Sequence, residues 1–212
     1  DVDGDVYLLA WTTTPWTLPS NTALVVGEKI EYVLISTTNK YTNLPVNVIL
    51  AKDRVAAYFT QAPEIKKTFK GKELIGVQYE QLMQYVQPLY DADKAFRVVS
   101  GDFVTTEDGT GIVHSSPTFG ADDFRVSKQN GIPPVTVRDA AGNEVPTVDK
   151  KGKFISQIGA KLVEGVSKYK IKTHKNLGAD DFYVKNYTDE DESNTDYKNT
   201  DVIISIILKE EN

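Results

Sequence analysis

The chain has 212 residues, which is enough for one large domain or two small ones with a buried core. Hydrophobic and charged fractions of 40% and 25% are ordinary for a globular protein, and a net charge of -6 argues against a general nucleic-acid binder. Zero cysteines and two histidines exclude a disulfide framework and a thiolate zinc site, so we expect no metal and a chain compatible with a reducing cytoplasm.

Short segments typical of strands dominate the first half of the chain. They are rich in β-branched and aromatic residues and are bounded by Gly, Pro, Asn or Asp, over residues 6–11, 22–26, 31–37, 47–52, 94–104 and 111–115. Two helices are predicted among them, at residues 53–61 and at residues 121–131, where Gly131 serves as a C-cap.

The second half of the chain contains fewer predicted strands and helices. Residues 133–145 predict a strand and a turn, and apolar residues recurring at helical spacing predict a helix over 158–166. The longest apolar run, Val202–Leu208, is far short of the roughly 20 residues of a membrane helix and predicts a buried strand. Many strands with few helices favour a mainly β chain with helices (α+β), built on a closed or nearly closed β-barrel.

The ends and the charge pattern bear on domain organisation. The chain starts at Asp1 and its only methionine is Met83, so we expect a single domain, residues 1–212, excised from a longer protein. Basic islands at residues 66–72, 150–153 and 167–176 are either solvated faces or contacts for a nucleic-acid backbone. The acidic run at residues 188–196 is expected to be a solvated loop.

No motif for a covalent nucleophile, a phosphate loop or a dinucleotide fold occurs, so any catalysis must rest on positioning and electrostatics. The stretch "TTTPWTLPSN", residues 12–21, suits this role. Its threonine hydroxyls donate and accept hydrogen bonds, β-branching restricts their rotamers, and Pro15 and Pro19 fix the backbone. The alternative is a structural turn that caps a barrel strand.

A second polar segment, "GTGIVHSSPTFGADDF", covers residues 109–124. Its glycines permit a tight turn into a short strand that carries His114, and Asp122 and Asp123 follow at a helix start, where the helix dipole favours acidic residues. Each residue by itself has an ordinary structural explanation, because histidines on strands are often core residues.

Together, "WTTTPWTLPSNTALVV" and "GTGIVHSSPTFGADDF" resemble two peptides of the editing domain inserted in isoleucyl-tRNA synthetases, one of the related valyl, isoleucyl and leucyl editing domains of class I synthetases. The valyl and leucyl enzymes typically have "TTRP" and "GTGAV" at these places, whereas this chain has "TTTPW" and "GTGIVH". Residues 154–201 resemble the family poorly and are expected to be a variable, insertion-like segment.

The resemblance implies post-transfer editing, in which the ester of valine on mischarged tRNA(Ile) is hydrolysed while isoleucine is excluded. It assigns catalytic roles to Thr12, Thr13, Thr14 and Asp123, with Asp123 also holding the substrate's α-ammonium and Asp122 facing solvent. It further implies that Trp16 forms a pocket wall, His114 excludes the larger side chain, and Asn21 anchors the loop or the tRNA end.

The same resemblance implies the partners of the domain. These are the 3' end of mischarged tRNA(Ile), its valine moiety and the synthetic domain of the same chain, in a cytoplasmic protein without membrane contact or a cofactor in this domain. Two other interpretations stay open: a non-catalytic β-barrel module that binds the tRNA acceptor end, and an unrelated interaction domain whose threonines are structural.

Overall fold

The structure, a computed structural model, describes residues 2–173, 177–184 and 199–211. The chain forms two compact units. Unit 1 comprises Asp1–Thr13, Thr22–Gln81 and Asp93–Pro133, and unit 2 comprises Thr14–Asn21, Leu82–Ala92 and Pro134–Asn212. The predicted single domain and its variable segment at 154–201 stay predictions, and the acidic run at 188–196 lies outside the described residues.

A four-stranded sheet of order β1-β4-β3-β5 forms one part of unit 1. Its strands are β1 (Val6–Leu8), β3 (Glu31–Thr38), β4 (Pro45–Ala51) and β5 (Glu64–Lys70). β3 is antiparallel to both neighbours, and β1 runs parallel to β4. Alternate residues of β3 and β4 pack into a small cluster around Ile35 and Leu50, both fully buried, as period-2 patterning requires.

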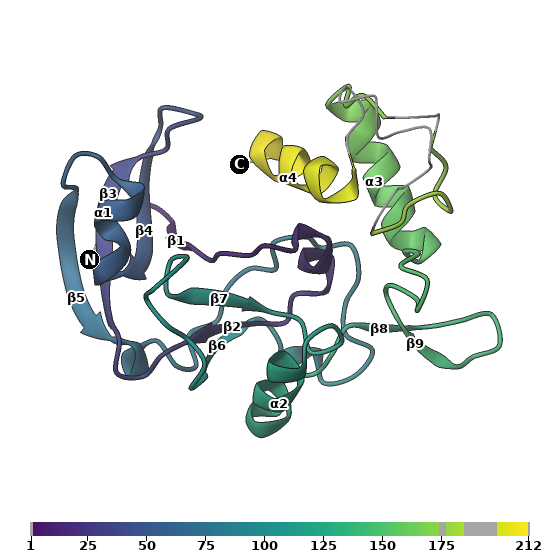
Figure 1. Cartoon of the computed structure of the whole chain (residues 1–212), viewed down its shortest axis with the longest axis horizontal. Helices are drawn as coiled ribbons and strands as arrows, with labels where there is room; N and C mark the ends of the chain where they lie inside the picture. Colours follow the sequence, from purple (N-terminus) through teal and green to yellow (C-terminus); the bar gives the residue numbers. More distant parts are fainter. Residues whose placement is uncertain (1, 174–176, 185–198, 212) are drawn as a thin grey trace. The chain divides into compact units, whose positions relative to one another are not determined.

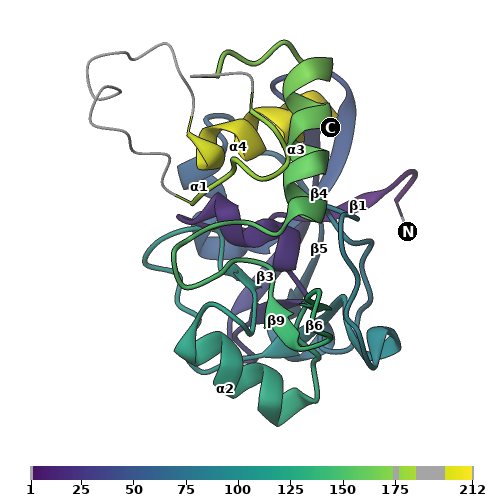
Figure 2. The same ribbon diagram turned by 90° about the vertical axis from the view of Figure 1, so that its right-hand side faces the viewer.

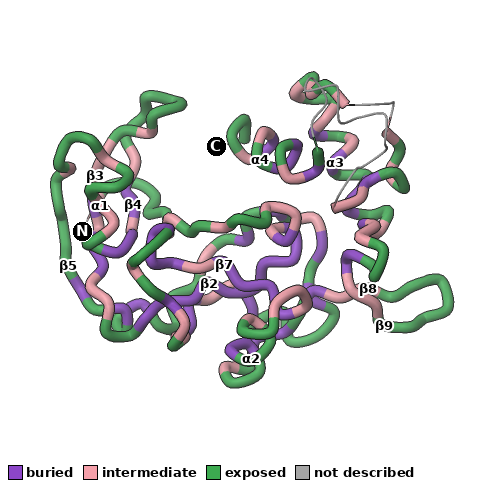
Figure 3. Tube along the Cα trace, in the orientation of Figure 1, coloured by how far each residue is buried: buried purple, intermediate pink, exposed green. Residues whose placement is uncertain are grey.

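The edge strand β5 was not predicted from the sequence, because most of its residues belong to the basic island at residues 66–72. All of its residues except Phe69 are exposed, as the green tube of β5 in Figure 3 shows. Lysines on an edge strand oppose pairing with other chains. They also give the segment the composition of a charged loop, so the strand was not recognised.

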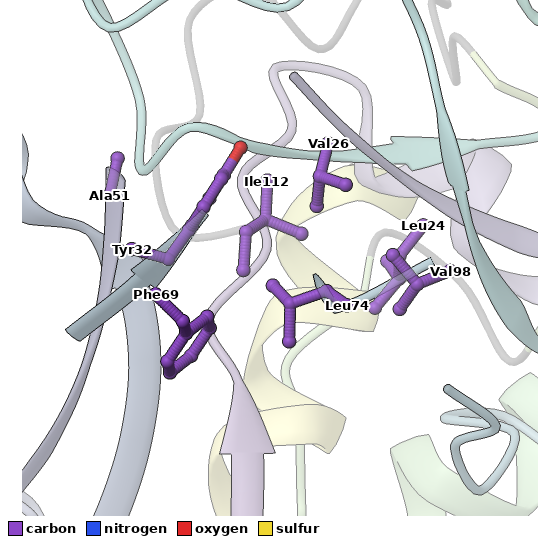
Figure 4. Close-up of a cluster of buried hydrophobic side chains, with 8 residues drawn as sticks. All are labelled: Leu24, Val26, Tyr32, Ala51, Phe69, Leu74, Val98 and Ile112. Carbon is purple, nitrogen blue, oxygen red and sulfur yellow. The ribbon is translucent and has the colours of Figure 1, made fainter. Parts of the chain in front are cut away.

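A three-stranded sheet of order β6-β2-β7 forms the other part of unit 1 (Figure 1). β2 (Ala23–Val26) lies in the centre, parallel to β6 (Arg97–Ser100) and antiparallel to β7 (Ile112–Ser115). All four residues of β2 are buried, as a central strand covered on both faces requires. Side chains from both sheets meet in one cluster, drawn in Figure 4: Leu24, Val26, Tyr32, Ala51, Phe69, Leu74, Val98 and Ile112.

Unit 1 also contains the two helices predicted in its sequence. The first is shorter than expected, a 3-10 turn (η2, Lys52–Arg54) followed by α1 (Val55–Tyr58). The second, α2 (Ala121–Asn130), ends as predicted at Gly131, whose φ of 65° is the left-handed conformation of a helix C-cap. Two further 3-10 turns are η3 (Gly71–Glu73) and η4 (Ala92–Lys94).

Unit 2 combines a short hairpin with helices. The hairpin pairs β8 (Thr136–Arg138) with β9 (Glu144–Pro146), where the sequence predicts a strand and a turn. The predicted helix extends over α3 (Ser156–Lys168), and Pro15–Ser20 forms the 3-10 helix η1. α3 and α4 (Thr200–Glu211) lie side by side in Figures 1 and 2 and are in contact.

Two predictions about this architecture are wrong. Residues 202–208 belong to helix α4, not to a strand, because Thr200, Ile203, Ile204 and Ile207 are buried at helical spacing on one face. The expected closed or nearly closed barrel is also absent from the described residues, since none of the three sheets closes on itself. What holds is the mixture of strands and helices. No described helix combines the length and the apolar character needed to cross a bilayer.

Candidate functional site

Asp123 lies in the first turn of α2, at the end of the loop that leaves β7. Its Oδ2 accepts a hydrogen bond of 2.9 Å from the backbone N–H of Ser116. Gly120 lies directly beneath the carboxylate, because a Cβ at that position would come within 3.1 Å of the Asp123 Cγ. A buried N–H and a glycine therefore hold the carboxylate in place.

The electrostatic surroundings of Asp123 favour a positively charged ligand. Burial raises the pKa of the Asp123 carboxyl above its ordinary value, the Ser116 N–H lowers it, and the charge of Asp122 raises it further. Among the described residues no cation pairs with Asp123. Because a half-buried carboxylate is costly without a counter-charge, this group is suited to receive an ammonium.

The neighbouring Asp122 has a different environment. It is exposed, as expected from the resemblance, and accepts an ion pair of 3.2 Å from Arg125. Arg125 also pairs with Asp102 at 2.8 Å, so the nearest arginine of the helix is already engaged by two exposed carboxylates. The two adjacent aspartates thus differ in exposure and in partners, and only Asp123 is left without a cation among the described side chains.

His114 lies on β7 opposite Leu24 of β2 and is 7% exposed. Burial lowers the pKa of its imidazole to about 4. The side chain is therefore neutral at pH 7 and acts through its shape and hydrogen-bonding atoms instead of through a charge.

The turn that begins β7 is fixed from beneath by a buried tyrosine. The Tyr32 hydroxyl donates to the carbonyl of Gly111 at 2.6 Å and accepts from the N–H of Gly27 at 3.1 Å. Burial raises the pKa of this hydroxyl to about 12, so it stays protonated and keeps its donor role. The Gly-Thr-Gly turn and the strand carrying His114 therefore rest on a satisfied polar network.

Thr12 and Thr13 lie beside β7 because the preceding residue, Trp11, is bound to that strand. Trp11 donates its N–H to the Ile112 carbonyl at 3.1 Å and forms a parallel bridge with Val113, the residue before His114. Its indole packs on Gly109, whose φ of 64° and missing Cβ permit this approach. Within unit 1 the structure thus brings the start of the threonine stretch alongside the His114 strand, with Thr12 half-buried and Thr13 exposed.

The remaining predicted site residues, Thr14, Trp16 and Asn21, belong to unit 2. Thr14 is exposed and precedes η1, Trp16 is half-buried within it, and Asn21 follows it with 4% of its surface exposed. The Thr17 hydroxyl donates to the Thr14 carbonyl at 2.9 Å, which closes the start of η1. The two prolines, which were expected to fix the backbone, therefore lie in a defined 3-10 helix.

Comparison with known proteins identifies the family. No family model matches the chain. An isoleucine–tRNA ligase of Cytophaga hutchinsonii is 54% identical over 73% of the chain, and that of Porphyromonas gingivalis is 42% identical over 99% of it. The chain belongs to the isoleucine–tRNA ligase family. It spans only 15% and 19% of the lengths of these two relatives.

The fold of this isoleucine–tRNA ligase segment has a solved counterpart. The editing domain of the P. falciparum cytosolic leucyl-tRNA synthetase matches with a TM-score of 0.51 and 10% identity. The match covers 97% of this chain and 76% of that domain. This likeness assigns the editing-domain fold, as the sequence motifs predict.

Sequence analysis of the isoleucine–tRNA ligase segment missed the groups that hold the site. Two of these groups, the Ser116 N–H and Gly120, hold Asp123, and the third, Tyr32, holds the Gly111 carbonyl from the core. A backbone N–H and a core tyrosine leave no recognisable motif near the residues that they hold. The glycine in "TFGADD" is the one sign of this support in the sequence. The described residues contain no group of three His, Asp or Glu side chains that could hold a metal ion.

Proposed function

We propose that this chain is the editing domain of an isoleucyl-tRNA synthetase and hydrolyses the ester of valine mischarged on tRNA(Ile), sparing cognate isoleucine. Support comes from the relatives, which are isoleucine–tRNA ligases, from the editing-domain fold and from the two sequence motifs. The observation that carries the proposal is the half-buried Asp123, which has a backbone hydrogen bond and no cation among the described residues.

The need for such an activity follows from the chemistry of the two amino acids. Isoleucine and valine differ by one methylene, which limits selection by a single apolar pocket to about 1–3 kcal/mol, a range for which isoleucyl-tRNA synthetases are themselves the standard example. A second site that admits valine and excludes isoleucine by size supplies the missing discrimination.

In the proposed reaction, Asp123 binds the α-ammonium of the aminoacyl group. An ionised carboxylate in a partly desolvated position forms a strong charge-assisted hydrogen bond to an ammonium, and the ammonium in turn offsets the cost of burying the carboxylate. The Ser116 N–H keeps the carboxylate oriented while the substrate is absent.

The hydrolysis itself is proposed to proceed by direct attack of water. The water oxygen adds to the ester carbonyl, the bond to the ribose oxygen breaks, and that oxygen leaves with a proton as the free hydroxyl of the terminal adenosine. Thr12, Thr13 and Thr14 are proposed to hold the water, the ester or the ribose through their hydroxyls, and backbone amides to stabilise the oxyanion. This reaction needs no cofactor in the domain.

Three further roles complete the proposal. The buried, neutral His114 limits the size of the side chain that is accepted. Trp16 supplies an apolar wall, and Asn21 anchors the loop or the tRNA end. The proposed partners are the acceptor end of mischarged tRNA(Ile) and the synthetic part of the parent protein, in the cytoplasm.

The test is deacylation of valyl-tRNA(Ile) and isoleucyl-tRNA(Ile) by the chain, its Asp123→Asn variant and an Asp122→Asn control. Asparagine retains an acceptor for the Ser116 N–H but loses the charge. We expect kcat/KM for the valyl ester to fall about 30- to 4,000-fold in Asp123→Asn, the equivalent of about 2–5 kcal/mol for breaking a desolvated charge pair. The exposed Asp122 should be replaceable with little effect.

A second arm tests the size limit. His114→Ala should hydrolyse isoleucyl-tRNA(Ile), which the unmodified chain spares. Equal hydrolysis of both esters by the unmodified chain would contradict the proposal. Binding of a non-hydrolysable valyl-adenosine analogue without any turnover would favour the acceptor-end binding module instead.

A further inference from the structure

The start of η1 is tied to the far end of the chain by one hydrogen bond. The backbone N–H of Trp16 donates to Oδ1 of Asp201 at 2.7 Å, although the two residues are 185 positions apart. Both belong to unit 2, where Asp201 occupies the first turn of α4 and η1 contacts that helix. This contact links the segment with Thr14 and Trp16 to a helix that was predicted as a strand.

The residues next to η1 in the sequence do not provide an acceptor that caps the start of this helix. The first N–H groups of a helix lack internal partners, and Pro15 at the first position of η1 has no N–H at all. The Thr14 side chain makes no capping hydrogen bond, so the Trp16 N–H is the first donor that needs an acceptor from elsewhere. Asp201 is that acceptor, and a carboxylate is also the group that the positive end of a helix favours.

The other end of η1 is held in the same unit. The Ser20 and Thr147 hydroxyl oxygens lie 2.6 Å apart, and both residues are buried. The Asn21 N–H donates to the Leu18 carbonyl at 3.0 Å, which closes the last turn. Ser20 therefore holds the end of η1, and Asp201 holds its start, where Thr14 precedes the helix and Trp16 lies in its first turn.

We propose that Asp201 is a positioning residue for the editing reaction, holding the Trp16 backbone and thereby orienting Thr14 and the Trp16 indole. The inference rests on the proposed function, because it presumes that Thr14 and Trp16 serve the deacylation. Asp201 itself touches no substrate in this proposal. It acts through the Trp16 backbone, two residues after Thr14.

The experiment compares Asp201→Ala, Asp201→Asn and a Val202→Ala control on the same turn of α4. Asparagine keeps an Oδ1 acceptor for the Trp16 N–H, whereas alanine removes it. Two readouts are measured: hydrogen exchange of the Trp16 amide by NMR, and kcat and KM for valyl-tRNA(Ile). We expect Asp201→Ala to speed Trp16 exchange about 10- to 100-fold, as loss of a hydrogen bond to a charged group predicts.

In the same variant we expect kcat to fall about tenfold with a smaller change in KM, while Asp201→Asn largely restores both readouts and Val202→Ala changes neither. Unchanged kcat in a folded Asp201→Ala variant whose Trp16 amide is deprotected would overturn the positioning role, and so would an amide that stays protected. Should Asp201→Ala not fold, Asp201→Ser, whose side chain is too short for the contact, takes its place with the same expected results.

The failure of the two proposals is distinguishable. A wild-type chain without deacylase activity overturns the proposed function and with it the catalytic consequence of Asp201. The Trp16 amide would still be protected in that chain if Asp201 anchors η1, because this readout does not depend on activity.

Discussion

Burial of His114 makes the size limit of the proposed sieve independent of pH near neutrality. With a pKa of about 4 its imidazole is neutral from pH 6 to pH 8. A size limit set by a neutral ring does not titrate near pH 7, so we expect selectivity between valine and isoleucine to stay constant from pH 6 to pH 8.

The same burial predicts an acid-sensitive stability. In the unfolded chain the histidine takes up a proton near pH 6.5, whereas the folded state resists it down to about pH 4. Stability from this residue is therefore complete above pH 6.5 and declines as the pH falls toward 4, by about 3 kcal/mol in total. Urea unfolding at pH 7.0 and pH 4.5 measures it, with Trp11 as the reporter of unit 1 in a Trp16→Phe background.

The control for this prediction is His114→Gln in the same background. Glutamine is polar and does not titrate, so its loss of stability between the two pH values should be smaller by roughly 2 kcal/mol or more. An identical loss in both proteins would assign the acid sensitivity to the carboxylates instead.

Near the site, the resemblance predicted the exposure of Asp122, but the sequence did not predict the groups that hold Asp123. The adjacent Asp122 and Asp123 differ in how far each is buried, in whether Arg125 reaches it and in the hydrogen bond that Asp123 accepts from the Ser116 N–H. Helix periodicity places the two side chains on different faces. The resemblance to the editing domains decided which of them was expected to bind the ammonium. The Ser116 N–H that holds Asp123 is a backbone group, and every residue except proline has one, so no side-chain pattern marks it.

Among the elements, α4 shows where sequence patterns reach their limit. A run of β-branched residues has strand propensity, but four to eight apolar residues in succession fit a buried helix equally well. Thr200, Ile203, Ile204 and Ile207 share one face against the rest of unit 2, and this packing outweighs the propensity. The helical spacing of these four residues was present in the sequence. The apolar residues between and after them, Val202, Ile206 and Leu208, turned it into an apolar run.

Packing of α4 on α3 gives a direct test. Ile207 is fully buried, and its Cδ1 lies over Gly165 so closely that a Cβ there would come within 2.4 Å. We expect Ile207→Ala to lower the free energy of unfolding by about 2–5 kcal/mol, because it removes methylenes and leaves a cavity. Val202→Ala, at a position that is 38% exposed, should cost less than about 1 kcal/mol.

The measurement is urea unfolding followed by the fluorescence of Trp16, which belongs to unit 2, in a Trp11→Phe background. Equal effects of the two substitutions would contradict the helix face on which Ile207 is buried and Val202 is exposed.

For the complete chain, the sequence motifs predict the family, but no feature of the sequence marks the division into two compact units. One of the boundaries between the units falls between Thr13 and Thr14, inside a string of three identical residues, where composition cannot change. The closed barrel was expected from the number of strands alone. Closure depends instead on which strands pair, and the long-range parallel pairing of β2 with β6 leaves no local pattern.

The net charge of -6 leads to a prediction about tRNA affinity. An acidic chain attracts RNA only through local basic groups, and on β5 these differ in their partners. Lys66 pairs with Glu64 at 2.7 Å, whereas Lys67 makes no ion pair with the described residues. We expect Lys67→Gln to reduce the slope of log K against log salt by about 0.7–0.9, the value of one phosphate contact.

Lys66→Gln is the matched control and should leave the slope unchanged, because Glu64 already neutralises that lysine. Binding of deacylated tRNA at several NaCl concentrations measures both slopes. Equal slopes for the unmodified chain and both variants would make this island a solvated face, the other interpretation of its charge.

The pairing of β2 also has a kinetic consequence. Residue 23 pairs with residue 97 on one side and with residue 115 on the other, so neither edge of this fully apolar strand has a nearby partner. Closing such long loops costs entropy before any contact repays it, which makes folding slow. During synthesis on the ribosome, β2 therefore has neither sheet partner until β6 emerges, and it has both only after the segment carrying His114 has emerged, which favours aggregation of the apolar strand.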